Sequence, residues 1–177
     1  MSRHSWLTRK YWAHFAKPAT DRELFRFLAN TPVASIVEFG VGKCQRLRQI
    51  ANVVQLADGA EKLRYVGTDE FEAAVDPSEH VSLKQAHQIA GSLDFKVTLM
   101  PGDAASAAPR VAHKVGLSDV VIVNGGMNPA DPMRSPLGPW LSRLTHDESH
   151  LFACEQAGGT LVAVNPRLLT AANRQAA

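Results

Sequence analysis

An acidic residue and two glycines directly follow a short apolar run, in the segment Glu38-Phe39-Gly40-Val41-Gly42. Glycine has no Cβ, so Gly40 and Gly42 can adopt backbone angles closed to other residues and let the chain approach a ligand closely. A helix beginning just after such a loop adds its free N–H groups. The Glu38 carboxylate favours a neutral or cationic ligand over a pyrophosphate. The segment therefore predicts a binding site, and a tight turn without a ligand is the alternative.

Two aspartates follow later apolar runs in the same way. Asp69 ends Tyr65-Val66-Gly67-Thr68-Asp69, and Asp103 stands in Pro101-Gly102-Asp103. A carboxylate at a strand end can accept hydrogen bonds from a ligand or can cap the following helix. We favour ligand contact for both.

The elements that must position these residues alternate between strand and helix. Helices are predicted between the strands, and a capping-box pattern at 20–23 indicates a short helix before the first strand. Repeated strand–helix units imply a parallel sheet with helices on both faces, whose carboxyl edge binds ligands. The predicted strands are 33–39, 63–68, 95–100, 119–124 and 159–164, and the predicted helices after the first strand are 43–57, 79–90, 105–114 and 145–158. A long loop is expected at 125–139.

Taken in order, these motifs resemble those of the class I S-adenosylmethionine (SAM)-dependent methyltransferases. The segment from Glu38 to Cys44 resembles the family's E/D-x-G-x-G-x-G motif, with Cys44 in place of the third glycine. The segments ending at Asp69 and around Asp103 resemble the stretches that bind the ribose hydroxyls and the adenine amino group. A dinucleotide fingerprint would need a small residue where Gln45 stands, which disfavours NAD.

The resemblance implies a Rossmann-like three-layer α/β sandwich with a mostly parallel sheet of about five strands in the order 3-2-1-4-5. It also implies SAM as the cofactor. Only 13 residues follow the last predicted strand, so the usual C-terminal antiparallel strand pair is expected to be missing, which leaves an edge for a homodimer. The cofactor-binding residues that the resemblance implies are Glu38, Gly40, Val41, Gly42, Asp69, Glu70, Asp103, Ala104 and Asn124.

Composition is consistent with one folded domain. The chain has 177 residues, 45% of them hydrophobic, and a formal net charge of +2. We predict a single domain over 1–177, with an N-terminal helical segment at 1–31 and a Rossmann-like core at 33–165. Two cysteines are too few for a disulfide framework, and no apolar run could span a membrane, which indicates a reduced, cytoplasmic protein.

Several residue patterns admit a functional and a plain interpretation, and we favour the plain one for each. Basic residues interleaved with aromatic ones before residue 18 form either a nucleic-acid patch or an amphipathic helix. His146 and His150 have a zinc-like spacing but no third ligand, so no metal site is predicted. Cys44 is either a reactive thiolate at a helix start or a small packing residue.

These features predict SAM-dependent methyl transfer to an unidentified acceptor, with a small-molecule substrate favoured. One alternative is a non-catalytic SAM-binding or nucleoside-binding module, or a protein-interaction module, on a reduced methyltransferase fold. Another is an RNA-associated methyltransferase. The sequence Asn124-Gly125-Gly126-Met127 lacks the Asn/Asp-Pro-Pro-aromatic signature of enzymes that methylate planar amino groups, which argues against base-amino methylation.

Overall fold

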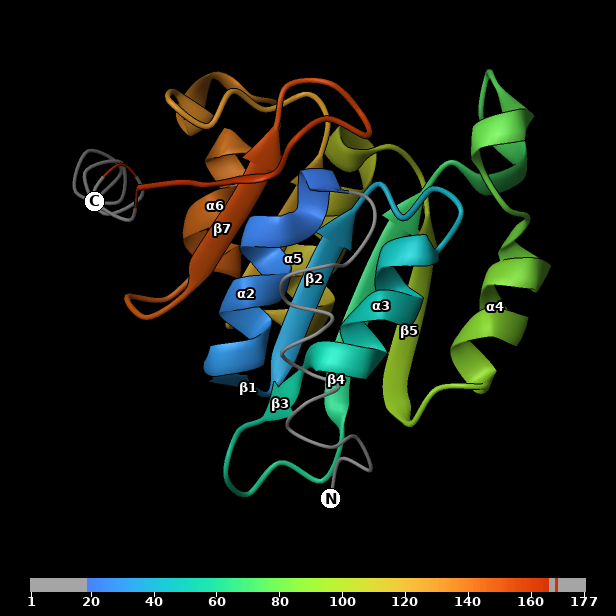
Figure 1. The fold of residues 1–177 in the computed structure, drawn as a ribbon. Coiled ribbons are helices and arrows are strands. Elements are labelled where there is room, and N and C mark those ends of the chain that lie inside the picture. Colours follow the sequence, from blue (N-terminus) through green and yellow to red (C-terminus); the bar gives the residue numbers. More distant parts are fainter. Residues whose placement is uncertain (1–18, 166–167, 169–177) are drawn as a thin grey trace.

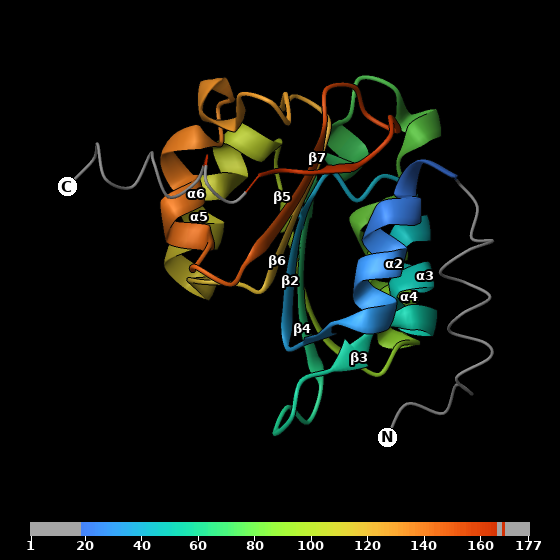
Figure 2. The ribbon, with the colours of Figure 1, turned by 60° about the vertical axis from the view of Figure 1, so that its left-hand side comes forward.

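A computed structural model describes residues 19–165 and 168, and it shows a central sheet with helices on both faces (Figures 1 and 2). The sheet has six strands in the order β5-β4-β2-β6-β7-β8. The first five are parallel, and β8 is antiparallel to β7. The strands are β2 (Ser35–Phe39), β4 (Leu63–Asp69), β5 (Phe95–Pro101), β6 (Val120–Asn124), β7 (His150–Cys154) and β8 (Val162–Ala163).

The helices form the two outer layers. Figure 2 shows α2, α3 and α4 on one face of the sheet and α5 and α6 on the other. The helices are α2 (Arg22–Asn30), α3 (Gln45–Val53), α4 (Leu83–Gly91), α5 (Ala104–Val115) and α6 (Gly138–Leu144). Short 3-10 turns occur at Ala19–Asp21, Phe71–Ala73, Pro77–Glu79 and Pro132–Arg134, and β1 (Pro32–Val33) pairs with β3 (Gln55–Leu56) in a separate two-stranded sheet.

The central strands β2 and β6 are buried on both faces, which explains their largely apolar sequences. Ile36 and Ile122 belong to the core cluster under α2 and α3. Their neighbours in the same strands, Val37 and Val121, point to the other face and belong to the cluster under α5 and α6. Met127 is also fully buried in that second cluster, so it anchors the loop after β6 and does not line a pocket.

The predicted Rossmann-like α/β class is confirmed, and the first four predicted strands occur in the predicted order. The prediction was wrong after residue 144. The segment 145–158 was expected to be a helix, but His150–Cys154 forms β7, which is paired with β6 over its whole length. The 159–164 segment supplies only the short strand β8, which pairs antiparallel with β7.

Two further expectations need correction. Asp21, not Thr20, stands at the N-cap of α2, and its side chain makes no capping hydrogen bond because Arg46 binds it. The 125–139 loop ends at a helix, α6, which begins at Gly138. The basic, aromatic segment before residue 18 lies outside the described residues.

In the described part of the chain, no helix has both the length and the apolar character that crossing a membrane requires.

Asp119 stabilises the amino edge of the sheet. Its Oδ2 accepts hydrogen bonds from the backbone N–H groups of Ala34 (2.7 Å) and Ser35 (2.9 Å), and its Oδ1 lies 3.2 Å from Nε2 of His146. Partial burial alone would raise the pKa of this carboxyl, but the hydrogen bonds from Ala34, His146 and Ser35 outweigh it and lower the pKa. The folded chain therefore favours the ionised form of Asp119.

Asp119→Ala is expected to lower the free energy of unfolding by about 1–2 kcal/mol at pH 7, the usual cost of removing a side chain that caps backbone N–H groups. Because the pKa is lower in the folded chain, this stabilisation is complete above the unfolded pKa of about 3.9 and disappears as the pH falls through the folded value. Urea unfolding at pH 7, 4 and 2.5 measures it. Asp147→Ala, in the exposed loop before β7, is the charge-matched control, and an equal loss for both variants would contradict the prediction.

Candidate functional site

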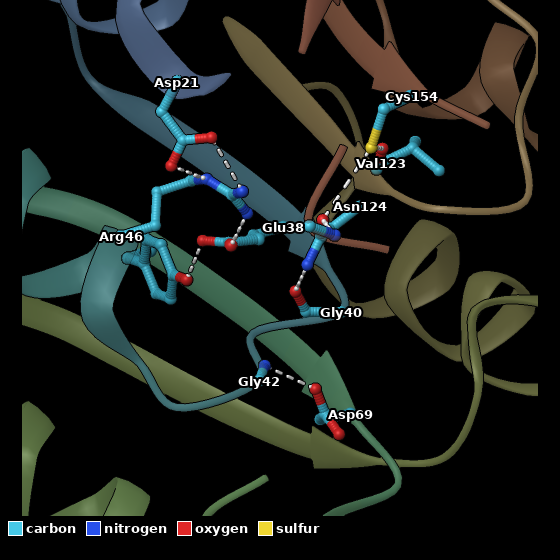
Figure 3. A network of polar contacts seen from close by, with 11 residues as sticks. Asp21, Glu38, Gly40, Gly42, Arg46, Asp69, Val123, Asn124 and Cys154 are labelled. Atoms are coloured by element: carbon cyan, nitrogen blue, oxygen red, sulfur yellow. Dashed lines mark hydrogen bonds and ion pairs between the residues drawn. The ribbon is translucent and has the colours of Figure 1, made fainter. Parts of the chain in front are cut away.

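The carboxyl ends of four parallel strands bring the predicted site residues to one edge of the sheet. The glycine loop follows β2, and Asp69 ends β4. Asn124 ends β6, and Asp103 follows β5. Figure 3 shows the glycine loop between Asn124 on one side and Asp69 on the other.

The glycine loop has a conformation that requires glycine. Gly40 has a φ of +87°, and a Cβ on it would lie 3.1 Å from the carbonyl oxygen of Asn124. The Asn124 side chain in turn donates from Nδ2 to the Gly40 carbonyl at 3.0 Å. Gly42 has a φ of +52°. The loop is therefore held close against the end of β6.

Cys44 occupies the position of the family's third glycine and has a left-handed backbone, with a φ of 55°. The sequence therefore departs from the motif while the backbone keeps a conformation that favours glycine. The thiol is fully buried. Burial, followed by the carboxylates of Glu38 and Asp69, raises the pKa of the Cys44 thiol to about 12. Cys44 is a packing residue and not a reactive thiolate.

Asp69 fixes the loop and a histidine at the same time. Its Oδ2 accepts a hydrogen bond from the Gly42 N–H at 2.7 Å. Its Oδ1 lies 2.5 Å from Nδ1 of His80 and 3.3 Å from the N–H of Phe71. The residue is almost completely buried, so most of its hydrogen-bonding capacity is used within the protein.

Glu38 does not reach the open part of the site. It is fully buried, and Nη1 of Arg46 donates to its Oε1 at 2.6 Å while the Tyr65 hydroxyl donates to its Oε2. Burial raises the pKa of the Glu38 carboxyl, and the guanidinium of Arg46 and the hydroxyl of Tyr65 act in the opposite direction without cancelling the rise. The predicted direct contact of Glu38 with a ligand is not available here, because Arg46 covers the carboxylate.

Arg46 joins three elements through this buried network. Its Nε and Nη2 donate to the two carboxylate oxygens of Asp21 at 2.8 and 2.9 Å, and its Nη1 binds Glu38 (Figure 3). Burial would lower the pKa of the guanidinium, but Glu38 and Asp21 outweigh it and raise the pKa, so Arg46 stays charged. The start of α2, the first turn of α3 and the end of β2 are thereby held together beside the glycine loop.

Two adjoining hollows open at this edge. The first has a volume of about 340 Å³, close to the lower limit of about 300 Å³ for small-molecule sites. The second has a volume of about 170 Å³. They share four lining residues, which are Gly40, Asp69, His80 and Asn124.

The charges around the two hollows differ. The first is lined by both signs, with Lys43 and Arg46 among the cations; its acidic residues are Asp21, Asp69 and Glu79. The second is lined by Asp69, Glu70 and Asp103 and by no lysine or arginine among the described residues. The second hollow therefore disfavours a phosphate and favours a neutral or cationic group.

Asp103 has a capping role as well as a place in the second hollow. Its Oδ1 accepts from the N–H groups of Ala105 and Ser106 at 2.8 and 3.0 Å, and its Oδ2 accepts from the Ser106 hydroxyl at 2.8 Å. Hydrogen bonds from the backbone and side chain of Ser106 lower the pKa of this exposed carboxyl. Asp103 and Ala104 line the second hollow together, so capping does not remove Asp103 from the site.

Sequence reasoning missed three residues of this edge. His80, Arg46 and Asp21 all line the first hollow. No local pattern marks them, because their partners lie far along the chain. Asp69 is 11 positions from His80, and Asp21 and Glu38 are 25 and 8 positions from Arg46. The signal that was available is the pair of opposite charges, Glu38 and Arg46, eight residues apart on either side of the glycine loop.

The two histidines with zinc-like spacing do not share a helix. His146 lies in the loop before β7, where it contacts Asp119, and His150 begins β7 with its ring 4.2 Å from that of Phe27. No group of three potential metal-ligating side chains occurs within residues 19–165 and 168.

No protein-family model matches the sequence, and no curated protein matches it. Solved structures are similar to it. The fibrillarin of Aeropyrum pernix in complex with natively bound S-adenosyl-L-methionine is 16% identical, with a TM-score of 0.48, over 80% of this chain and 55% of that chain. The MycE methyltransferase of the mycinamycin biosynthetic pathway is 19% identical, with a TM-score of 0.44, over 86% of this chain and 39% of that chain.

The N-terminal domain of EvdMO1, in the presence of S-adenosylhomocysteine (SAH) and D-fucose, is 13% identical, with a TM-score of 0.46, over 92% of this chain and 73% of that chain. The chain thus spans about half of the fibrillarin chain and about two fifths of the MycE chain. The Rossmann-like α/β sandwich of this chain is given by its own sheet order and by the helices on both faces of the sheet.

Proposed function

We propose that the chain binds SAM across the carboxyl edge of its sheet and transfers the methyl group to a small-molecule acceptor. The observation that carries the proposal is the second hollow, whose charged lining consists of the carboxylates of Asp69, Glu70 and Asp103 beside the glycine loop. A nucleoside offers hydroxyl and amino donors to such carboxylates, whereas a nucleotide phosphate would be repelled by them.

The residues present fit this cofactor. In the second hollow, Glu70 is exposed, unlike Asp69, and would accept from ribose hydroxyls, and Asp103 and Ala104 would meet the base. In the first hollow, acidic residues outnumber basic ones, which suits the positive sulfonium and ammonium groups. Gly40 and Gly42 allow the backbone to approach the ligand closely. The roles of these residues in binding belong to the proposal.

Methyl transfer from a bound sulfonium asks little of the protein beyond positioning. The cofactor supplies a methyl group that is already activated for attack. The chain would have to hold an acceptor in line with it and exclude water, which is the proximity contribution to catalysis. Asn124 would serve this task; in support, it ends β6, contacts Gly40 and lines both hollows.

Calorimetric titration tests the cofactor part of the proposal. The chain should bind SAM and SAH and should bind NAD and ATP more weakly, because their phosphates meet the acidic lining. Folded protein that binds neither SAM nor SAH at millimolar concentration would overturn the proposal. Binding without transfer to any acceptor in a panel of small molecules would leave a nucleoside-binding module.

We also propose a reducing, cytoplasmic location for the chain. In support, Cys44 and Cys154 are both free and buried.

A further inference from the structure

The chain between β4 and α4 is built to return His80 to the tip of β4. Phe71 turns the chain at a positive φ of 50°, and its side chain is anchored in the core. At the other end, Ser82 caps α4 in a reciprocal capping box with Gln85, and Glu72 accepts from the N–H of Leu83 at 2.9 Å. The 71–82 segment is therefore fixed at both ends.

Near its end, at Glu79, this segment lies against the glycine loop. Glu79 lies 3.4 Å from the Lys43 ammonium, and its carbonyl oxygen would lie 3.4 Å from a Cβ placed on Gly42. The next residue is His80, whose Nδ1 contacts Asp69 at 2.5 Å. His80 is thus held at the hollows that it lines by its contact with Asp69 and by the approach of Glu79 to the glycine loop.

Asp69 and His80 differ in what they offer to a ligand. The Asp69 side chain is 2% exposed, and its two oxygens already accept from Gly42, Phe71 and His80. The His80 side chain is 26% exposed. A ligand in the hollows therefore meets the imidazole before it meets the carboxylate behind it.

The carboxylate also fixes which imidazole nitrogen is available. Asp69 can only accept, so Nδ1 of His80 carries the proton of that hydrogen bond, and a neutral ring then has an acceptor at Nε2. Within residues 19–165 and 168, the imidazole makes its one side-chain hydrogen bond through Nδ1, and Nε2 has no hydrogen-bond partner. A hydroxyl group can donate to Nε2 of a neutral ring or accept from it in a charged ring.

We infer that His80 is a ribose-binding residue of this site: Asp69 orients the ring through Nδ1, and Nε2 binds a ribose hydroxyl of the nucleoside ligand. The inference rests on the proposed function and deepens it, because it makes His80 the direct contact and Asp69 the positioning residue. The site would then select ribonucleosides over deoxyribonucleosides.

Two substitutions separate direct contact from positioning. In His80→Asn the amide nitrogen stands near the place of Nδ1, so the contact with Asp69 is kept and the distal nitrogen is lost. In His80→Gln the amide reaches toward the place of Nε2, and the contact with Asp69 is lost. Calorimetric titrations with SAH, adenosine, 2′-deoxyadenosine and 3′-deoxyadenosine are made on both variants and on the wild-type chain, with thermal melts as the folding control.

Direct contact predicts that His80→Asn weakens SAH and adenosine binding about three- to tenfold, the usual value of one neutral hydrogen bond. The loss for His80→Asn should be larger than the loss for His80→Gln. It also predicts that one deoxyadenosine, the one without the contacted hydroxyl, binds equally to the wild-type chain and to His80→Asn. Equal SAH binding by the wild-type chain and both variants would overturn the role of His80, as would a smaller loss for His80→Asn than for His80→Gln. If the folded wild-type chain binds neither SAH nor adenosine, the proposed function itself fails.

Discussion

Arg46→Met is expected to lower the free energy of unfolding by about 3–5 kcal/mol, the usual cost of removing one partner from a buried ion pair. The substitution leaves the carboxylates of Asp21 and Glu38, both nearly inaccessible to water, without their cation. In the variant, the Glu38 carboxylate would keep its hydrogen bond from the Tyr65 hydroxyl but would lose the one from Arg46. Urea unfolding followed by circular dichroism measures the loss.

The loss should depend on pH. Burial already raises the pKa of Glu38, and without Arg46 the pKa rises further. A group whose pKa is raised in the folded chain favours folding when protonated, and this advantage is lost as the pH rises through the folded pKa. The deficit of Arg46→Met should therefore be larger at pH 8 than at pH 5.

The control lies on the same helix. Arg48 is exposed on α3, so Arg48→Met removes the same charge and should change the free energy of unfolding by no more than about 0.5 kcal/mol. Equal losses for the two variants would show that the buried network contributes nothing specific. The network also bears on function, because it holds the start of α2 and the first turn of α3 beside the first hollow.

Asp69→Ala is expected to weaken SAH binding by about 1–3 kcal/mol, the cost of leaving polar groups without partners. The N–H of Gly42 and Nδ1 of His80 would both lose their acceptor. The effect should thus combine a looser glycine loop with a misoriented imidazole. Asp69→Asn keeps one acceptor oxygen and should lose less.

Calorimetry gives both affinities. Asp58→Ala is the charge-matched control, because Asp58 is exposed in the loop between β3 and β4, which precedes the amino end of β4. Its SAH affinity should equal that of the wild-type chain. An unchanged affinity for Asp69→Ala, in a chain that binds SAH, would mean that Asp69 has no part in the site.

Sequence predicted correctly those strands and loops whose structure depends on their own residue types. The strand ending at Phe39 is largely apolar because it is buried on both faces, and the glycines that follow are needed for positive φ angles. The strand ending at Asp69 is buried at every position except Arg64. These local requirements appear directly as residue types, so pattern and structure agree there.

The error at β7 shows where local signals end. Thr145 and Glu148 have the spacing of a capping box, yet the chain at His150–Cys154 is a strand because β6 offers its whole length for pairing. The Thr145 hydroxyl instead donates to the Leu141 carbonyl at the end of α6. Five apolar or aromatic residues fit a buried strand as well as a helix, and only the neighbouring strand decides between them.

By itself, the sequence determined the alternation of strands and helices, the glycine loop and the acids that follow the strands, because each depends on residues adjacent in the chain. Only the tertiary structure decided what those acids face: Glu38 turned inward to Arg46, and Asp69 turned to Gly42 and His80. The physical reason is that a hydrogen bond or an ion pair depends on distance in space. The partners are brought together by packing and strand pairing, which no local pattern records.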